Sequence, residues 1–493
     1  MRSCLLYIAI LPLLLLSSCN NWLEIEPDDR VMEKKLFSSR EGFITALNGV
    51  YIEMSSSVLY GGQMLVIPDI LAQYYKAAMP SEHRYSYFSS FSYDQQAVKS
   101  AFQGIWEKYY ALIVNCNTIL EHCDEGQELL GEKYYNVVKG EALALRAFFH
   151  FEVLRIWGPV FKENREMVCI PYAESSKIEV RPLLSAEVVY EKIKRDLTEA
   201  EAYLKESDPI LTEGLLFSAG GLGEGNDMRY RNLRLNYYAV QALLARVALY
   251  CDDQPLALAY AKKVVDAVQK EDDELFPFKS RTQDLDDRVY QSELLFAHYN
   301  IQRANIYQNY FSNSLADANV LRVKDALVDK LFDEQDFRYR YQWSKQKNPS
   351  DAEQYYLVKY KDVSLSSNPT EDEKLRKEYR YLVPMIRISE LYFIIAECET
   401  NQEEALNAIN KVRSARAVKA ITDFSSLPDE LEKEYAREFV GEGQLFFYYK
   451  RLAKEGIPYD KGNYSWSTTS YIDMSTDRYV LFLPDSEKNN RVE

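Results

Sequence analysis

Apolar residues recur at helical spacing along most of the chain. Residues 97–123 carry large apolar side chains three and four positions apart, which predicts one amphipathic helix with a buried stripe. Residues 134–157 are apolar around most of the helix and end at Gly158-Pro159, so we expect this helix in the middle of the fold. Further helices are predicted over 184–205, 234–251, 255–269, 388–399, 402–415 and 428–452. Paired helices with short turns favour an all-α dominated, tetratricopeptide-like scaffold, although no clean repeat period is present.

The helical periodicity fades in three places. Between residues 276 and 384, Asn, Ser, Asp and Tyr accumulate, which predicts a loop-rich lobe with short strands inserted into the scaffold. Residues 68–95 form a second irregular stretch, and the tail from Pro458 onward is a third.

The N-terminus has the layout of a cleavable export signal. An apolar run from Leu5 to Leu16 is too short to span a bilayer, and Ser17 and Ser18 precede a single Cys19. The Leu-Ser-Ser-Cys order resembles a bacterial lipobox, in which the cysteine is acylated and holds the protein to a membrane. An ordinary signal with a chance cysteine is the alternative. We therefore divide the chain into a lipoprotein signal (1–18), an N-terminal helical scaffold (19–275), the inserted lobe (276–384), and C-terminal helices and tail that complete the same domain (385–493).

The net charge limits the classes of ligand, and the cysteine count bears on disulfide bonds. The formal net charge of −16 argues against nucleic acid and polyanionic ligands. Beyond Cys4 and Cys19, five cysteines remain, and an odd count is a poor disulfide framework. We predict that all five are buried, small apolar residues: Cys116, Cys123, Cys169, Cys251 and Cys398.

Catalytic and metal-binding patterns are weak. The four histidines are scattered without an HExxH or CxxC pair, so we predict no metal site and no cofactor, and we expect His150 to be a satisfied core residue. The glycine-rich stretch 218–231 lacks the GK[ST] ending of a phosphate loop and is interpreted as a connector. No GxSxG elbow is present. Carboxylates are too numerous to indicate a glycosidase pair, and structural ion pairs explain Arg387, Glu390 and Glu397 more simply than catalysis.

Aromatic residues in the irregular stretches are the remaining candidates, because the chain has 39 tyrosines. Solvent-facing rings stack on the C–H faces of sugars, while Asn, Asp, Gln and Arg side chains hydrogen-bond sugar hydroxyls. The alternative for each ring is that it packs beneath its own loop, as most large aromatics do. We predict ring platforms at Tyr74, Tyr75, Tyr85, Tyr87, Tyr341 and Trp343. We predict polar partners at Asp69, Gln73, Arg84 and Asn305.

Seven segments of the chain, in order, match one family pattern. They are CNNWLEIEP (19–27), GEALALRAFFHFEVLRIWGPV (140–160), RLNYYAVQALLARVALY (234–250), PMIRISELYFIIAEC (384–398), ALNAINKVRSARA (405–417), REFVGEGQLFFYYKRL (437–452) and FLPDSEKNN (482–490). With these segments the chain resembles the SusD/RagB family of nutrient-binding outer-membrane lipoproteins. Three features depart from the family pattern: Gln444-Leu445 stands where an Arg is common, FLPDSEKNN lacks Ile-Pro, and the usual Asn-Pro-Gly tail is missing.

The resemblance implies a lid-like binding protein without catalytic chemistry. Its ligand site is implied in the loop of 68–95 and in the inserted lobe, the same regions that the aromatic residues indicate. The family further implies a lipid-anchored position on the outer membrane, facing the cell exterior, and a TonB-dependent transporter of the SusC type as partner. We therefore predict capture of an oligosaccharide or polysaccharide for uptake.

Three alternatives stay open from the sequence alone. They are a peptide-binding RagB-like uptake protein, a lipid-anchored glycoside hydrolase with an unplaced carboxylate pair, and a purely structural anchor subunit. A ring platform at Trp343 predicts that Trp343→Ala weakens glycan binding without unfolding the protein.

Overall fold

The computed structural model describes residues 28–75, 82–215, 228–270, 273–279, 286–323, 325–370, 373–374, 377–458, 471–489 and 491. The predicted export signal, Cys19 and most of the glycine-rich stretch 218–231 lie outside these residues.

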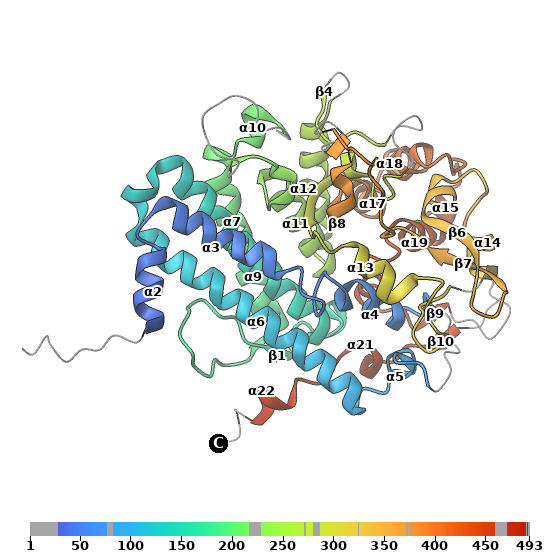
Figure 1. The fold of residues 1–493 in the computed structure, drawn as a ribbon, viewed down its shortest axis with the longest axis horizontal. Coiled ribbons are helices and arrows are strands. Elements are labelled where there is room, and N and C mark those ends of the chain that lie inside the picture. Colours follow the sequence, from blue (N-terminus) through green and yellow to red (C-terminus); the bar gives the residue numbers. More distant parts are fainter. Residues whose placement is uncertain are drawn as a thin grey trace, which may run out of the picture.

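Long helices pack on one another in chain order and form the scaffold (Figure 1). The helix α6 (Gln96–Glu125) packs on α7 (Gln127–Trp157), and α7 packs on α9 (Ala186–Ser207). The series continues with α11 (Tyr237–Tyr250), α12 (Gln254–Val268), α17 (Ile388–Cys398) and α18 (Gln402–Ala415). This arrangement of helical pairs confirms the predicted helix-dominated fold class.

The sequence pattern explains why these helices form and where they lie. In α6 the predicted stripe from Phe102 to Ile119 is buried, whereas α7 is buried around its whole girth from Tyr135 to Trp157. The helix α7 ends at Gly158, where Pro159 stops it. Other helices begin with a side-chain cap. In α11, the side-chain oxygen Oδ1 of Asn236 accepts hydrogen bonds from the backbone amides of Tyr238 and Ala239, both at 3.0 Å.

The predicted helix over 428–452 is wrong in one respect, because two helices cover this range. The helix α19 (Leu427–Glu438) ends before a turn, and α20 (Leu445–Arg451) begins after it. Gly441 and Gly443 both adopt positive φ in that turn, at 72° and 66°, which a helix does not allow.

The inserted lobe leaves and re-enters the scaffold through one antiparallel pair of strands. β5 (Leu294–Tyr299) pairs with β8 (Leu382–Arg387), with Leu294 opposite Arg387 and Tyr299 opposite Leu382. Because these strands lie next to each other, α12 and α17 still pack directly on one another on either side of the lobe. The lobe also holds the hairpin of β6 (Trp343–Lys347) and β7 (Glu353–Leu357), which agrees with the predicted short strands.

The remaining elements are short helices and strand pairs. The helices are α2 (Asp28–Leu36), α3 (Arg40–Glu53), α4 (Gln63–Leu71), α5 (Ser86–Ser89), α8 (Phe161–Asn164), α10 (Ile210–Glu213), α13 (Ala304–Ile306), α14 (Asp325–Leu331), α15 (Phe337–Gln342), α21 (Thr476–Tyr479) and α22 (Asp485–Asn489). The 3₁₀ helices are η3 (Arg231–Leu233), η4 (Gln291–Glu293), η6 (Glu378–Tyr381) and η7 (Phe424–Ser426), and η5 (Tyr307–Phe311) is a π-helix. The strand pairs are β1 (Val168–Ile170) with β2 (Leu184–Ser185), β3 (Gln269–Lys270) with β4 (Asp273–Glu274), and β9 (Gly456–Pro458) with β10 (Tyr471–Asp473).

The five cysteines are free and buried, as predicted. Within the described residues, none of the helices combines the length and the apolar character that crossing a membrane would need.

Candidate functional site

Two segments that the sequence marks as irregular meet on one side of the molecule. The first contains α5, and the second contains α13 and η5 (Figure 1). The amide of Arg84 donates a hydrogen bond to the Ala318 carbonyl at 3.2 Å, and the Tyr85 ring lies 6.4 Å from the Tyr310 ring. A second contact, 5.8 Å between the Tyr75 and Phe311 rings, lies deeper in the same place.

Arg84 is at the centre of this meeting point. Its guanidinium carbon lies 5.0 Å from the centroids of both the Tyr85 and the Tyr310 rings, and the guanidinium donates a hydrogen bond to the Asn309 carbonyl. Such cation–π contacts hold a long side chain in one place while leaving its other N–H groups able to donate. Arg84 remains exposed, so its charge lies at the surface next to two aromatic rings.

The segment that Arg84 contacts carries exposed amide side chains. Asn305, Gln308 and Asn309 are all exposed, and they belong to α13 and to the π-helix η5. π-helical turns are rare and are frequently found at functional sites. Tyr87, on α5, keeps 45% of its surface exposed. We call these exposed residues of the two contacting segments, Arg84, Tyr87, Asn305, Gln308 and Asn309, the junction face.

The rings and polar groups predicted on the first segment are mostly internal, which corrects the expectation for four of them. Asp69, Gln73, Tyr74 and Tyr75 are at most 4% exposed. Asp69 lies in α4 and the other three follow that helix, and this part of the 68–95 loop lies against the turn after α19, since Asp69 Oδ2 accepts a hydrogen bond from the Gly441 amide at 2.7 Å. Burial raises the pKa of Asp69 to about 8. These four residues shape the loop from inside and present no ring face to solvent.

Tyr85 and Trp343 are also buried, at 7% and 5% exposed, so neither is the solvent-facing platform that the sequence suggests. Trp343 begins β6 and packs 6.1 Å from the Phe332 ring. Tyr341 is half-buried, and its ring lies 5.8 Å from Phe337 in the same helix, α15, rather than against the loop of Arg84. The predicted residues that share the junction face are Arg84, Tyr87 and Asn305.

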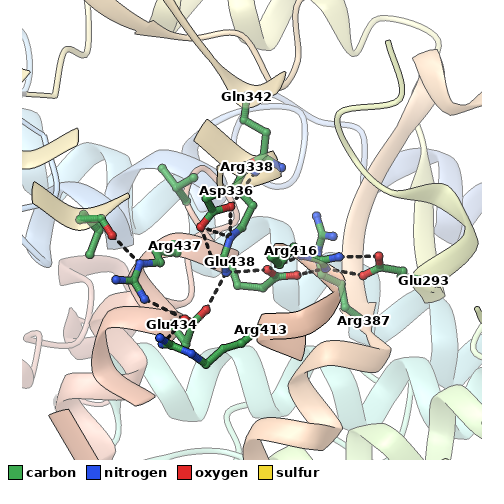
Figure 2. A network of polar contacts seen from close by, with 12 residues as sticks. Glu293, Asp336, Arg338, Gln342, Arg387, Arg413, Arg416, Glu434, Arg437 and Glu438 are labelled. Carbon is green, nitrogen blue, oxygen red and sulfur yellow. Dashed lines mark hydrogen bonds and ion pairs between the residues drawn. The ribbon is translucent and has the colours of Figure 1, made fainter. Parts of the chain in front are cut away.

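A buried ion network holds the inserted lobe against the C-terminal helices (Figure 2). Arg338, in α15, is fully buried and donates to Asp336 Oδ2 and Glu434 Oε2, both at 2.8 Å. It also donates to Glu438 Oε2 at 3.0 Å, so one guanidinium of the lobe joins two carboxylates of α19.

A second arginine extends the network to the entry strand of the lobe. Arg416, after α18, donates to Glu293 Oε1 at 2.7 Å and to Glu438 Oε2 at 3.0 Å. Arg387, at the end of β8, donates to Glu442 at 2.9 Å. Burial alone raises the pKa of a carboxyl group, but three guanidinium groups around Glu434 outweigh burial and lower the pKa of Glu434 to about 2: Arg338, Arg437 and Arg413.

Ion pairs of this kind also involve Arg387, Glu390 and Glu397, the three charged residues that the sequence analysis weighed as catalytic candidates. Glu390 pairs with Arg246 and Glu397 with Arg451, while Arg387 pairs with Glu442, so each of the three residues singled out in the sequence has a structural partner. Removing one partner of a buried ion pair leaves the other charge uncompensated, which is strongly destabilising. A structural role therefore explains why each of these three charged residues has a partner of opposite charge. We interpret the network as the support that fixes the lobe and thereby η5.

His150 is the core residue that the sequence predicts. Its Nε2 accepts a hydrogen bond from the Ala173 amide at 2.9 Å, its Nδ1 lies 2.9 Å from the Arg146 carbonyl, and burial lowers its pKa to about 3. The described part of the chain contains no group of three or more His, Cys, Asp or Glu side chains arranged to hold a metal ion.

Comparison with known proteins gives a consistent result. The family model described as "Starch-binding associating with outer membrane" matches residues 21–212, and the model described as "SusD family" matches residues 219–491. The chain is 26% identical over 209 residues to a SusD-like protein of Bacteroides ovatus and 23% identical over 205 residues to one of Formosa agariphila. These matches cover 42% and 40% of this chain, and only 36% and 37% of the two relatives.

Solved structures share the fold over nearly the whole chain. A SusD-like carbohydrate binding protein from Bacteroides vulgatus aligns with a TM-score of 0.67 at 18% identity, covering 92% of this chain and 96% of its own. A SusD superfamily protein from Bacteroides thetaiotaomicron aligns with a TM-score of 0.67 at 21% identity, covering 92% and 98%. At these identities the similarity concerns the fold alone.

Tyr310 is one of the aromatic residues that crowd the irregular lobe in the sequence, but the predicted platform does not include it, and the sequence predicts no π-helix there. The run YQNYF carries two tyrosines and two amides within five residues, which is an unusual polar and aromatic mixture for a buried helix. That composition is the signal that could have drawn attention to this segment, but a π-turn has no periodicity that a sequence pattern reveals.

Proposed function

The chain belongs to the SusD family, and on that premise we propose that it captures a glycan for nutrient uptake and performs no chemistry on it. The relatives and structures named above include a carbohydrate binding protein, which supports glycan as the ligand class. The junction face supplies what a sugar needs, because exposed amides and a guanidinium hydrogen-bond hydroxyls while the Tyr87 ring offers a stacking surface.

The observation that carries this proposal is the position of Arg84. Its guanidinium lies 5.0 Å from two tyrosine rings and donates to the Asn309 carbonyl of η5, a segment that carries exposed amide side chains, at the point where the 82–90 loop meets the inserted lobe. A fixed donor costs little conformational entropy when it binds a ligand, which is the advantage of preorganisation. A single cationic group among neutral amides favours hydroxyl-rich ligands over highly charged ones.

We further propose that the protein is anchored to the outer membrane through a lipid on Cys19 and delivers its ligand to a TonB-dependent transporter of the SusC type. The Leu-Ser-Ser-Cys order and the family membership support the anchor. The family membership supports the transporter. Incorporation of labelled palmitate into the wild-type chain, and its loss in Cys19→Ala, tests the anchor directly.

The ligand class is tested by affinity gel electrophoresis and calorimetry on the chain without its signal and Cys19 (residues 20–493). The panel contains soluble starch, dextran, xyloglucan, galactomannan, arabinoxylan and homogalacturonan, with a peptide digest as control. We expect retention by at least one glycan, with the glycan recovered intact. Retention of peptides alone would replace glycan by peptide as the ligand class, and release of shorter products would contradict the absence of chemistry.

A further inference from the structure

A second hollow lies where the C-terminal tail crosses the start of α6. It has a volume of about 220 Å³ and is lined by Tyr93, Asp94, Lys99, Phe102, Gln103 and the segment Leu481–Lys488. The Tyr93 and Phe102 rings are buried, 6.4 Å apart and nearly perpendicular, so they form an apolar floor. Phe482 lines the hollow, is 67% exposed, and has the Lys488 ammonium 5.3 Å from the centre of its ring. We call this hollow the tail pocket.

The rim of the tail pocket is polar and balanced in charge. Its lining contains two carboxylates, Asp94 and Asp485, and two ammonium groups, Lys99 and Lys488. Lys99 and Asp485 are 3.8 Å apart and both exposed, a weak contact that a ligand can replace. The amide of Gln103 adds a group that can both donate and accept hydrogen bonds. This combination of an exposed ring, a neutral amide and balanced charge suits an uncharged, hydroxyl-rich ligand.

The size of the tail pocket limits that ligand. A volume of about 220 Å³ lies below the roughly 300–1,000 Å³ typical of pockets for drug-sized ligands. The tail pocket therefore has room for one sugar ring, and a longer chain would have to continue across the surface.

A continuous layer of rings connects the tail pocket with the junction face. From Tyr310 the ring contacts run to Tyr85 at 6.4 Å, to Phe88 at 5.5 Å and to Phe102 at 6.0 Å. Phe102 is also the floor of the tail pocket. This layer of rings therefore begins beside Arg84, at the junction face, and ends beside Tyr93, in the tail pocket.

We propose that the tail pocket is a second sugar-binding site, which takes one uncharged unit of the same glycan chain that lies on the junction face. This inference rests on the proposed glycan-binding function and adds to it a preference for chains long enough to reach both places. The exposed Phe482 ring stacks on the sugar unit, and Gln103 and Asp94 bind its hydroxyls. Two joined contacts raise the apparent affinity of a long chain above that of a short one, because the second contact forms within the same complex.

Phe482→Ala tests the tail pocket, with Ile178→Ala as the matched control. Ile178 is fully exposed and lies outside both surfaces, so its removal controls for the loss of an exposed apolar side chain. Calorimetry would use the polysaccharide that the wild-type protein retains from the panel above, together with the di- and trisaccharide made from it. We expect Phe482→Ala to weaken polysaccharide binding about tenfold, as truncation of a ligand-stacking aromatic does, and to leave binding of the short fragments unchanged.

Amide hydrogen exchange provides an independent readout in the wild-type protein. The polysaccharide should slow exchange in residues 93–103 and 481–488 as well as in residues 82–90 and 302–311. Equal polysaccharide affinity of Phe482→Ala and the wild type, or protection confined to the junction face, would overturn the second site while leaving the proposed function intact. Homogalacturonan is a negatively charged polysaccharide, so its retention alone would contradict the proposal that the tail pocket binds an uncharged sugar unit. If the wild type retains no glycan at all, the proposed function fails and this inference fails with it.

Discussion

At the scale of single residues, the large aromatic side chains of the irregular segments divide into two kinds. Tyr74, Tyr75, Tyr85 and Trp343 are buried, whereas Tyr87 and Phe482 keep 45% and 67% of their surfaces exposed. Composition cannot separate these two kinds, because a loop that folds back on a scaffold buries rings without any helical or strand periodicity. Arg84 is the exposed cation that lies against two tyrosine rings, and it is one of the four polar partners that the sequence predicts.

Trp343→Ala is expected to destabilise the protein and not to affect a ligand contact directly. The Trp343 ring is 5% exposed and packs on Phe332, so its removal leaves a cavity that costs about 3–5 kcal/mol of unfolding free energy. Chemical denaturation measures this, with Tyr87→Ala as a control that changes stability by no more than about 0.5 kcal/mol. A Trp343→Ala variant with wild-type stability would mean that Trp343 does not belong to the core of the lobe.

At the scale of elements, the turn between α19 and α20 decides how α4 is held. Gly441 donates its amide to Asp69, and a Cβ on Gly443 would lie 2.2 Å from the Met64 carbonyl oxygen. Both glycines have positive φ, so this turn combines a left-handed backbone with a close approach of two main chains. The turn cannot be recognised in the sequence of 428–452, because the apolar residues before and after it both follow helical spacing.

Gly443→Ala is expected to destabilise the protein by about 2 kcal/mol or more, since a left-handed residue with a Cβ costs about 1–2 kcal/mol before the contact with Met64 is counted. Gly49→Ala is the matched control. Gly49 lies inside α3, its added Cβ would meet nothing within 4 Å, and alanine is the better helix former there by about 1 kcal/mol. Thermal unfolding of both variants checks the pair, and equal melting temperatures would contradict the close approach.

Sequence patterns predict the long helices of the scaffold well, and the reason is physical. The apolar stripe of α6 and the apolar girth of α7 each specify their own burial. The inserted lobe is predicted as an irregular region, but its helices and its π-turn depend on contacts far apart in the sequence. Arg338 and Arg416, for example, find their carboxylates on α19 and at Glu293, which no local pattern reveals.

At the scale of the whole molecule, a rigid helical scaffold positions one loop from each of two distant segments. The lobe is held by paired strands at its base and by the buried ion network at its side (Figure 2). Within the lobe, the segment of η5 contacts the 82–90 loop. Binding groups on loops that a rigid scaffold positions are a common arrangement in proteins. We therefore expect substitutions in the junction face to change the affinity for the ligand, and substitutions on the surface of the scaffold to leave it unchanged.

The most direct test of this central claim is a calorimetric titration of the wild-type protein and three variants with the glycan that the panel identifies. Arg84→Ala and Tyr87→Ala remove groups of the junction face, while Leu129→Ala removes an apolar side chain of similar exposure, 47%, at the start of α7. We expect the two junction-face variants to lose about tenfold in affinity with unchanged unfolding midpoints, and Leu129→Ala to bind like the wild type. Equal affinities for all four proteins would contradict the account.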